Sequence, residues 1–232
     1  MFNFLKSKKP QYIILVRHAQ SIGNVDKTIY ATIPDHALIL TPKGLGQALH
    51  RGGELSNFLI EKNIKNVNFY VSTYHRTILT YREIATQLIS NNILYNTQYS
   101  PLLREQELSN GVFPGDLLKV HKEKDKISQF YYRFGGGESC ADVYNRQALF
   151  LNDLFSQFQK GFPKACIIVG HGMQLRVLLM RFFHMSVEDF ELLKNPQNCC
   201  QIILKLQKSG NYTIMGELEK YEKPTHPYQL PL

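Results

Sequence analysis

The stretch YIILVRHAQSIGN, residues 12–24, opens with five consecutive apolar residues and then turns polar. Such an apolar run is typical of a strand that is buried on both faces, as in a parallel sheet. Arg17 and His18 follow at the point where the buried strand should end. An Arg-His pair is usually surface, but ligands of open α/β sheets bind beyond the carboxyl ends of the strands. The pair is therefore a candidate site as well as a candidate surface turn.

The rest of the chain repeats this order of an apolar segment followed by a helical pattern. Residues 67–71 and 165–169 predict two more buried strands, and residues 201–206 and 212–216 predict a hairpin around the turn KSGN. Because strands and helices alternate, we expect an α/β fold with a mostly parallel sheet. Helices are expected over residues 42–62, 76–90, 138–160 and 172–185.

The first of these helices carries local signals of its own. Thr41 followed by Pro42 predicts a cap and then a proline in the first turn, where no N–H group is missed. Gly52 and Gly53 lie in the middle of the same helix, and glycine weakens a helix interior.

We expect a single domain over residues 11–220, with a basic amino-terminal arm at 1–10 and a proline-containing tail at 221–232. Within the domain, residues 106–137 break the alternation with several glycines and a proline. They predict a lid-like insertion that covers the top of the sheet. Its aromatic residues could line the lid or pack beneath it, and packing is favoured; they are Tyr131, Tyr132 and Phe134.

Composition and charge limit the classes of function. The chain has 232 residues, 44% of them hydrophobic, enough to bury a sizeable core. No apolar run reaches the ~18 residues of a membrane span, and the start lacks the ~7–15 apolar residues of a secretory signal. We therefore expect a cytoplasmic protein without stable membrane insertion, with export by a route that needs no such signal as the alternative. The net charge of +8 is compatible with anionic ligands, although solvated surface lysines are the favoured explanation.

The four cysteines do not form a metal-binding pattern. Cys140, Cys166, Cys199 and Cys200 contain no CxxC pair, which disfavours a zinc site and favours free thiols. No nucleic-acid-binding motif is visible either. We expect no metal, no cofactor and no nucleic-acid partner.

Arginines and histidines follow each of the three predicted buried strands. Arg17 and His18 follow the first, Arg76 comes soon after the second, and His171 lies between two glycines after the third. Each alone is more often a solvated charge or a turn. The carboxyl ends of parallel strands, however, meet at one edge of a sheet, and no matching acids stand beside these residues in the sequence. We therefore predict that the four side chains converge on one site.

Phosphoryl transfer suits this set, because negative charge then spreads over three phosphate oxygens. Arg17 and Arg76 can each direct two N–H groups at a phosphate. A histidine can attack phosphorus, and flanking cations disfavour its protonated form. The amides that open the helix at Gly172 add an anion site beside His171. Glu105, in the segment LLREQE, offers the acid that protonates the leaving oxygen.

Four motifs in order resemble the histidine phosphatase superfamily, which includes the phosphoglycerate mutases. Its patterns are R-H-G-[EQ]-[ST] with a following Asn, S-P-x-x-R-[TA]-x-x-T, L-R-E and [ST]-H-G-x-x-[LI]-R. The resemblance covers about residues 12–180, and runs such as IPDH and GGES resemble the cytosolic broad-range phosphatase branch of fungi and plants. The matching segments are RHAQS with Asn24, STYHRTILT at 72–80, LRE at 103–105 and GHGMQLR at 170–176.

This resemblance implies a three-layer α/β/α sandwich, as in phosphoglycerate mutase, and a metal-independent phosphatase. It implies that His18 accepts the phosphoryl group and that Glu105 donates the proton. The other pocket residues that it implies are Arg17, Asn24, Arg76, His171, Gly172 and Met173, the last two through their backbone.

Four residues depart from what the resemblance leads us to expect: Ala19 replaces Gly, Thr73 replaces Pro, Gly170 replaces Ser or Thr, and Ser109 replaces Gly. Ala19 adds a methyl group beside the predicted nucleophile and would be excluded if the backbone there needed a positive φ. Gly170 lacks a hydroxyl that could orient the site. None of the four removes a predicted catalytic group, so we expect an active enzyme.

Three functions stay open from the sequence: a phosphomonoesterase, a mutase that moves phosphate between hydroxyls, and a non-catalytic module that binds phosphate or phosphoproteins. The insertion has no Arg-Arg pair to hold a phosphoglycerate, although Arg133 could reach in. Pure binding would need neither His18 nor Glu105. We favour the phosphatase, with a small phosphate ester or a phosphorylated substrate as its partner. A homodimer paired through a strand such as 67–71 stays open.

Overall fold

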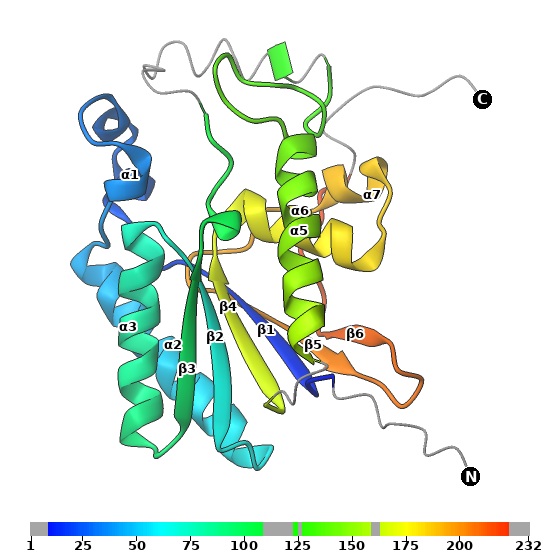
Figure 1. Ribbon diagram of the computed structural model, residues 1–232. Coiled ribbons are helices and arrows are strands. Elements are labelled where there is room, and N and C mark those ends of the chain that lie inside the picture. Colours follow the sequence, from blue (N-terminus) through cyan, green and yellow to red (C-terminus); the bar gives the residue numbers. More distant parts are fainter. Residues whose placement is uncertain (1–8, 109–122, 125–126, 159–162, 223–232) are drawn as a thin grey trace.

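A six-stranded sheet lies at the centre of this computed structural model, which describes residues 9–108, 123–124, 127–158 and 163–222 (Figure 1). The strands follow the order β3-β2-β4-β1-β5-β6. The first four are parallel, whereas β5 runs antiparallel to β1 and β6 antiparallel to β5. The mostly parallel sheet is thereby confirmed. The strands are β1 Tyr12–Arg17, β2 Asn66–Ser72, β3 Leu94–Ser100, β4 Ala165–Gly170, β5 Gln201–Leu206 and β6 Tyr212–Met215.

Helices cover both faces of the sheet and complete a three-layer α/β/α sandwich (Figure 1). Along β1, Ile14 and Val16 face the layer of α2 and α3, while Ile13 and Leu15 face the layer of α5 and α6. All four side chains are buried, which is the physical reason for the continuous apolar run. The longer helices are α2 Pro42–Glu61, α3 His75–Ser90, α5 Cys140–Phe158 and α6 Gly172–Phe183. The shorter ones are α1 Ile22–Val25, η1 Lys27–Ala31, η2 Asp35–Ala37, η3 Pro101–Leu103 and α7 Val187–Leu192.

The start of α2 agrees with its sequence signals, and its glycines have a second role. The Thr41 hydroxyl accepts a hydrogen bond from the Gly44 amide at 3.0 Å, with Pro42 in the first turn. A Cβ on Gly52 would lie 2.9 Å from the Ile84 Cα in α3. Gly52 therefore lets the two helices approach closely. Its low helix propensity alone does not indicate this role.

The strand β3 was not predicted, because it lies at the edge of the sheet and lacks an apolar run. Its sequence LYNTQYS leaves most side chains wholly or partly exposed, and Leu94 is 73% exposed. Since β2 pairs with β3 on one side and β4 on the other, it has no open edge. The expected pairing of residues 67–71 across a dimer is therefore wrong.

The described part of the insertion, which lacks residues 109–122 and 125–126, includes both buried and exposed aromatic rings. Phe134 is 4% exposed, whereas Tyr131 is 62% exposed. Packing thus holds for Phe134 and fails for Tyr131. The amino-terminal arm and the tail fall largely on residues 1–8 and 223–232, outside the described residues.

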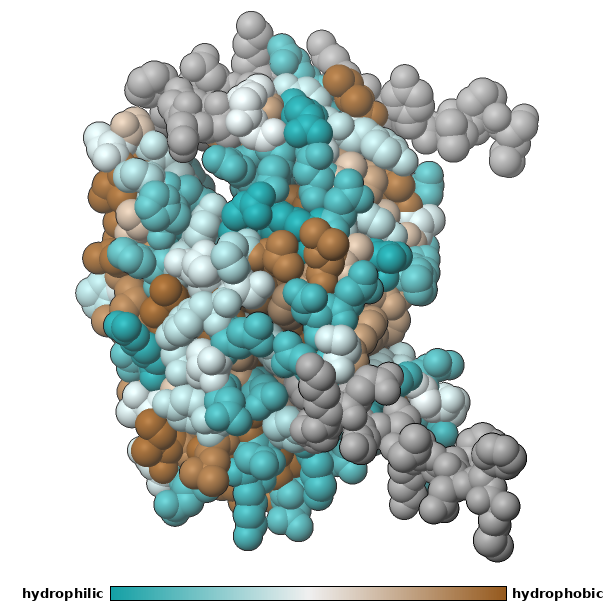
Figure 2. Space-filling model, viewed as in Figure 1, coloured by the Kyte–Doolittle hydropathy of each residue, from teal (hydrophilic) through white to brown (hydrophobic). Residues whose placement is uncertain are grey.

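The described surface is mixed in polarity. Figure 2 shows hydrophilic residues over much of one face with apolar residues among them near its centre, and further apolar residues at the lower left, where α3 ends and β3 begins. Ile89 and Leu94 are exposed at this junction. Among the helices of the described residues, none is long and apolar enough to span a bilayer.

Candidate active site

The residues that follow the buried strands meet beside a cavity of about 790 Å³. Arg17 ends β1 and His18 follows it, while Arg76 lies in the first turn of α3. All three line the cavity. His171 follows β4, and its ring centroid lies 5.2 Å from that of His18, but it lies behind the cavity wall and is fully buried. The structure thus brings the four side chains together, with His171 behind the other three.

The hydrogen bonds of His18 define its tautomer. Nδ1 lies 2.7 Å from the carbonyl oxygen of Ala19, which can only accept, so Nδ1 carries the proton. Nε2 is left with a lone pair, and it accepts a bond from Arg76 Nε at 3.2 Å. Burial, with the charges of Arg76 and Arg17, holds the pKa of His18 well below its ordinary value. The ring is therefore neutral and presents an unprotonated nitrogen to the cavity.

Ala19 fits this geometry without strain. Among the described residues, the non-glycine positions with positive φ are Asn63, Asn92, His184 and Cys199. Ala19 is fully buried, and its methyl group packs in a small apolar cluster. The replacement of glycine by alanine at this position therefore introduces no backbone strain.

His171 is neutral for the same physical reason as His18. Its Nε2 lies 2.8 Å from the Ser72 hydroxyl, and its Nδ1 is buried with no hydrogen-bond partner among the described residues. Burial is the largest cause of its lowered pKa, and the charge of Arg76 lowers the pKa further. The ring of Tyr74 packs against it with centroids 5.0 Å apart.

Arg17 and Asn24 complete the wall around His18. Arg17 Nη1 donates to the carbonyl oxygen of Pro196 at 2.6 Å, while its Nε is buried and has no acceptor in the described part of the chain. Asn24 Oδ1 accepts from Ser21 and from Asn198, and none of the described residues accepts from its Nδ2. Both side chains therefore keep an N–H group that could bind an anion.

Arg76 has an acidic partner that the sequence analysis did not foresee. Its Nη1 lies 2.8 Å from Asp35 Oδ1, and its Nη2 lies 3.2 Å from Oδ2. Nη1 also donates to the Asp35 backbone oxygen at 2.6 Å. The expectation of arginines without matching acids is wrong for Arg76, because the acid comes from η2, 41 residues earlier in the chain.

Glu105 occupies the amino-terminal end of α6. Its Oε1 accepts from the amides of Gln174 and Gln106, both at 2.9 Å, and its Oε2 accepts from the Met173 amide at 3.2 Å. Of the amides expected to bind phosphate, that of Met173 therefore already binds a carboxylate. The Gly172 amide has no acceptor among the described residues, and Gly172 lines the cavity.

Two buried side chains that the sequence analysis missed hold the segment that carries Glu105. Arg146, in α5, donates to the carbonyl oxygens of Leu102, Arg104 and Glu105 at 2.7–3.1 Å. It also binds both carboxylate oxygens of Glu138 at 3.0 Å. Glu138 lies in the quoted GGES run, but nothing in the sequence pairs it with Arg146.

The comparisons with known proteins agree with this geometry. The sequence pattern of the histidine phosphatase superfamily (branch 1) matches residues 13–215. The chain belongs to this family. A phosphoglycerate mutase-like protein of Arabidopsis thaliana is 37% identical over 216 residues, which cover 88% of this chain and 68% of that protein. A broad-range acid phosphatase of Saccharomyces cerevisiae is 25% identical and covers 92% and 91% of the two chains. The predicted resemblance to the fungal and plant branch is confirmed.

Solved structures share the fold of the family at low identity. A structure called mycobacterial hydrolase 1 has a TM-score of 0.72 and 16% identity, and covers 92% of this chain and 100% of that chain. A mycobacterial glucosyl-3-phosphoglycerate phosphatase has a TM-score of 0.67 and 18% identity, with 90% and 99% covered. Together with the sheet and its helices, they confirm the three-layer sandwich of this histidine phosphatase.

In this family member a glutamine fills the space left by Gly170. A Cβ on Gly170 would lie 2.1 Å from Gln174 Oε1, which accepts from the His171 amide at 3.3 Å. Gln174 Nε2 donates in turn to Gln147 Oε1 at 2.9 Å. The side-chain amide of Gln174 thus orients the His171 backbone at the place where a hydroxyl was expected.

The outer wall of the cavity mixes aromatic, cationic and acidic groups. Lys27 lines it, and burial, with the charges of Arg17 and Arg76, lowers the pKa of its ammonium group. Arg133 does not line the cavity; it is paired with Asp142 at 2.6 Å, so its expected reach into the site is wrong. Further lining residues include Tyr30, His36, Tyr74, Glu107, Lys124, Gln129, Phe134 and Asn195.

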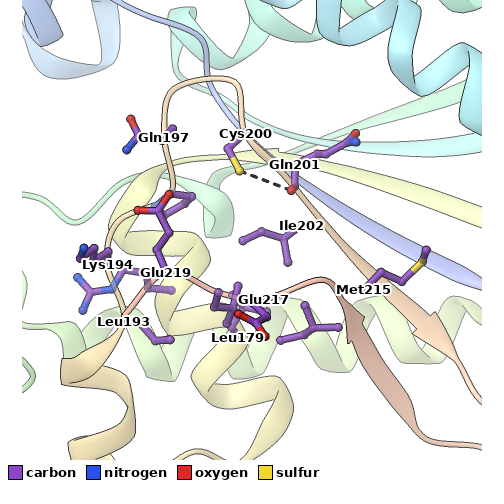
Figure 3. Close-up of a pocket in the computed structure, with 14 residues that line it drawn as sticks. Leu179, Leu193, Lys194, Gln197, Cys200, Gln201, Ile202, Met215, Glu217 and Glu219 are labelled. Carbon is purple, nitrogen blue, oxygen red and sulfur yellow. Dashed lines mark hydrogen bonds between the residues drawn. The ribbon is translucent and has the colours of Figure 1, made fainter. Parts of the chain in front are cut away.

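A second, smaller cavity of about 110 Å³ lies between β5, β6 and the segment before β5 (Figure 3). Cys200 lies at its edge, with Sγ 3.5 Å from the Gln201 carbonyl oxygen. Burial raises the pKa of this thiol, which makes it a poor nucleophile.

Within the described residues, no three His, Cys, Asp or Glu side chains are grouped so that they could hold a metal ion.

Proposed function

We propose that this histidine phosphatase hydrolyses small phosphate esters through a phosphohistidine on His18. One observation carries the proposal: Ala19 fixes the Nδ1 proton, so Nε2 of a neutral ring in the cavity wall keeps a lone pair, which accepts a bond from Arg76 Nε at 3.2 Å. Such a nitrogen can attack phosphorus, and arginine N–H groups can take up the phosphate charge. The phosphatase names of several relatives support this class of reaction.

We assign the reaction two steps. His18 Nε2 attacks phosphorus, the bond between phosphorus and the ester oxygen breaks, and this oxygen takes a proton from Glu105. Water then attacks the phosphohistidine and gives a proton to Glu105, and the phosphorus–nitrogen bond breaks. Inorganic phosphate leaves, and both residues return to their first state.

The two oxygens of Glu105 differ in a way that supports its role as the acid. Two amides hold Oε1 at 2.9 Å, whereas one longer bond of 3.2 Å reaches Oε2. Oε2 therefore loses less hydrogen bonding when it takes a proton, and it is the oxygen that we assign to proton transfer. Phosphate contacts are assigned to Arg17, Asn24, Arg76 and the Gly172 amide.

Hydrolysis of p-nitrophenyl phosphate in EDTA, at acid to neutral pH, tests the proposal and the expected independence of metal. Wild type should turn over, and His18→Ala should lose at least about 1,000-fold in rate, because the phosphoryl acceptor is gone. His50→Ala, on the exposed face of α2, is the matched control. A wild type without turnover, or a fully active His18→Ala variant, contradicts the proposal.

Mutase activity is the alternative, since some relatives are called phosphoglycerate mutase-like. It predicts that a hydroxy acid takes the phosphoryl group faster than water does. The pairing of Arg133 with Asp142 disfavours it, because that arginine was the expected anchor for a second anion. A cytoplasmic location and a homodimer stay predictions.

A further inference from the structure

Asp35 and His18 bind two different edges of the Arg76 guanidinium group. Nη1 gives its two hydrogens to the backbone oxygen and Oδ1 of Asp35, and Nη2 gives one hydrogen to Oδ2. Nε gives its single hydrogen to His18 Nε2. Because arginine has five N–H groups, one Nη2 hydrogen is left.

This remaining hydrogen points along the same edge as Nε–H. In a planar guanidinium group, the bidentate bond to Asp35 takes the end formed by Nη1 and Nη2, so the second Nη2 hydrogen lies parallel to Nε–H. That side edge faces His18 Nε2. A phosphoryl group on Nε2 would displace the single Nε–H bond and meet two parallel donors, while Asp35 could keep the end edge.

We propose that Asp35 is a positioning residue that holds the end edge of Arg76 so that its side edge grips the phosphoryl group on His18. The inference rests on the proposed function and assigns a role to a residue of η2 that lies outside the four motifs.

The surroundings of Arg76 support a fixed orientation. The Arg76 side chain is 4% exposed, whereas the Asp35 side chain is 32% exposed at the cavity wall. The guanidinium carbon of Arg76 lies over the ring of Tyr74, 5.0 Å from the centroid of that ring. A buried charge that loses its partner becomes costly and adopts new contacts, so the orientation of Arg76 depends on Asp35.

The opposite role would be that of an internal competitor, in which Asp35 must release Arg76 before phosphate binds. The two roles predict opposite changes in the affinity for phosphate when the Asp35 carboxylate is removed. Without the carboxylate, phosphate should bind more weakly if Asp35 positions Arg76, and more tightly if Asp35 competes with phosphate.

The test uses the full chain with Asp35→Asn, which keeps the shape of the side chain, and Asp35→Ala. Asp26→Asn is the control, because Asp26 is an exposed acid that precedes the same segment and whose carboxylate, among the described residues, accepts hydrogen bonds from Thr28 alone. The dissociation constant of inorganic phosphate is measured by calorimetry, and the mobility of the Arg76 Nε–H group by its nitrogen-15 signal. Both Asp35 variants should weaken phosphate binding roughly tenfold, the order expected for a misplaced donor pair, and broaden that signal.

The outcomes separate this inference from the proposed function. If wild type binds no phosphate, the proposed function fails and the inference fails with it. If wild type binds phosphate and Asp35→Asn binds it equally well or more tightly, only the positioning role is overturned. If Asp35→Ala does not fold, Asp35→Asn decides the matter alone, and Asp26→Asn should match wild type within about twofold because the loss of a solvated charge has little effect.

Discussion

At the scale of single residues, the site depends on partners that fix atoms in place. The Ala19 carbonyl sets the tautomer of His18, and Asp35 sets the edge that Arg76 presents. Gln174 substitutes for a hydroxyl that Gly170 cannot supply. Asp35 lies outside the four motifs, Ala19 stands where the family pattern has Gly, and Gln174 stands at a motif position that the pattern leaves open. The motifs therefore name the reacting groups but not the groups that orient them.

Arg146 offers a test of orientation that does not touch the predicted reacting groups. In Arg146→Lys, the bonds to the segment 102–105 are lost while a positive charge remains, so Glu105 should shift relative to α6. We expect kcat to fall by about 10–100-fold and KM to change by less than about threefold, since small misplacements act on the reacting geometry. Steady-state kinetics measures both constants.

The control for this variant is Arg133→Lys, which changes an exposed arginine paired with Asp142. It should leave kcat within about twofold, because exposed ion pairs contribute little. An unchanged kcat in Arg146→Lys, or an equal loss in both variants, would show that the bonds from Arg146 to the segment 102–105, which we call the Arg146 clamp, do not position Glu105.

At the scale of elements, close packing of α2 on α3 underlies one layer of the sandwich. The apolar cluster on this side includes Leu55 and Leu59 from α2 and Ile84 and Leu88 from α3, all buried. Since Arg76 lies in the first turn of α3, the packing of this helix also places the guanidinium beside His18. A change in the spacing of α2 and α3 should therefore shift Arg76 relative to His18.

Two neighbouring glycines of α2 test this packing as a matched pair. Gly52→Ala puts a methyl group 2.9 Å from the Ile84 Cα, and should lower the free energy of unfolding by about 1–3 kcal/mol. Gly53→Ala meets nothing within 4 Å, and should raise it by about 0.5–1 kcal/mol through helix propensity. Urea denaturation measures both changes, and the same sign in both variants would contradict the predicted close contact.

At the scale of the whole molecule, two buried neutral histidines link global stability to pH. The pKa values of His18 and His171 in the folded state lie well below the ordinary 6.5. Below about pH 6.5 the unfolded chain therefore binds protons that the folded chain does not. By linkage, stability falls as pH falls through this window. The fall begins near pH 6.5, which is above the ordinary pKa values of carboxylates.

We expect the urea midpoint of wild type to be lower at pH 5 than at pH 7.5. The difference between the two pH values should shrink in His171→Asn, which removes one of the two groups, and stay unchanged in His50→Asn on the surface. Equilibrium denaturation at both pH values measures these differences. An equal difference in wild type and His171→Asn would mean that His171 does not carry the linkage.

The sequence by itself determined the α/β class, the major helices, and five of the strands. Apolar runs and helical periods report which faces are buried, and burial decides these elements. It also placed Arg17, His18, Arg76 and His171 at one edge, because parallel strands bring their carboxyl ends together. The roles of these residues stay predictions, although the family that their motifs resemble is confirmed.

Only the tertiary structure decided the edge strand β3, the pairing of Asp35 with Arg76, and the clamp of Arg146 on the segment before Glu105. A half-exposed strand lacks an apolar run, so it leaves no clear period in the sequence. Polar partners that lie 41 residues apart leave no period either, because they meet only where the path of a loop brings them within hydrogen-bonding distance. The reacting groups can thus be read from local patterns, whereas their orientation depends on the folded chain.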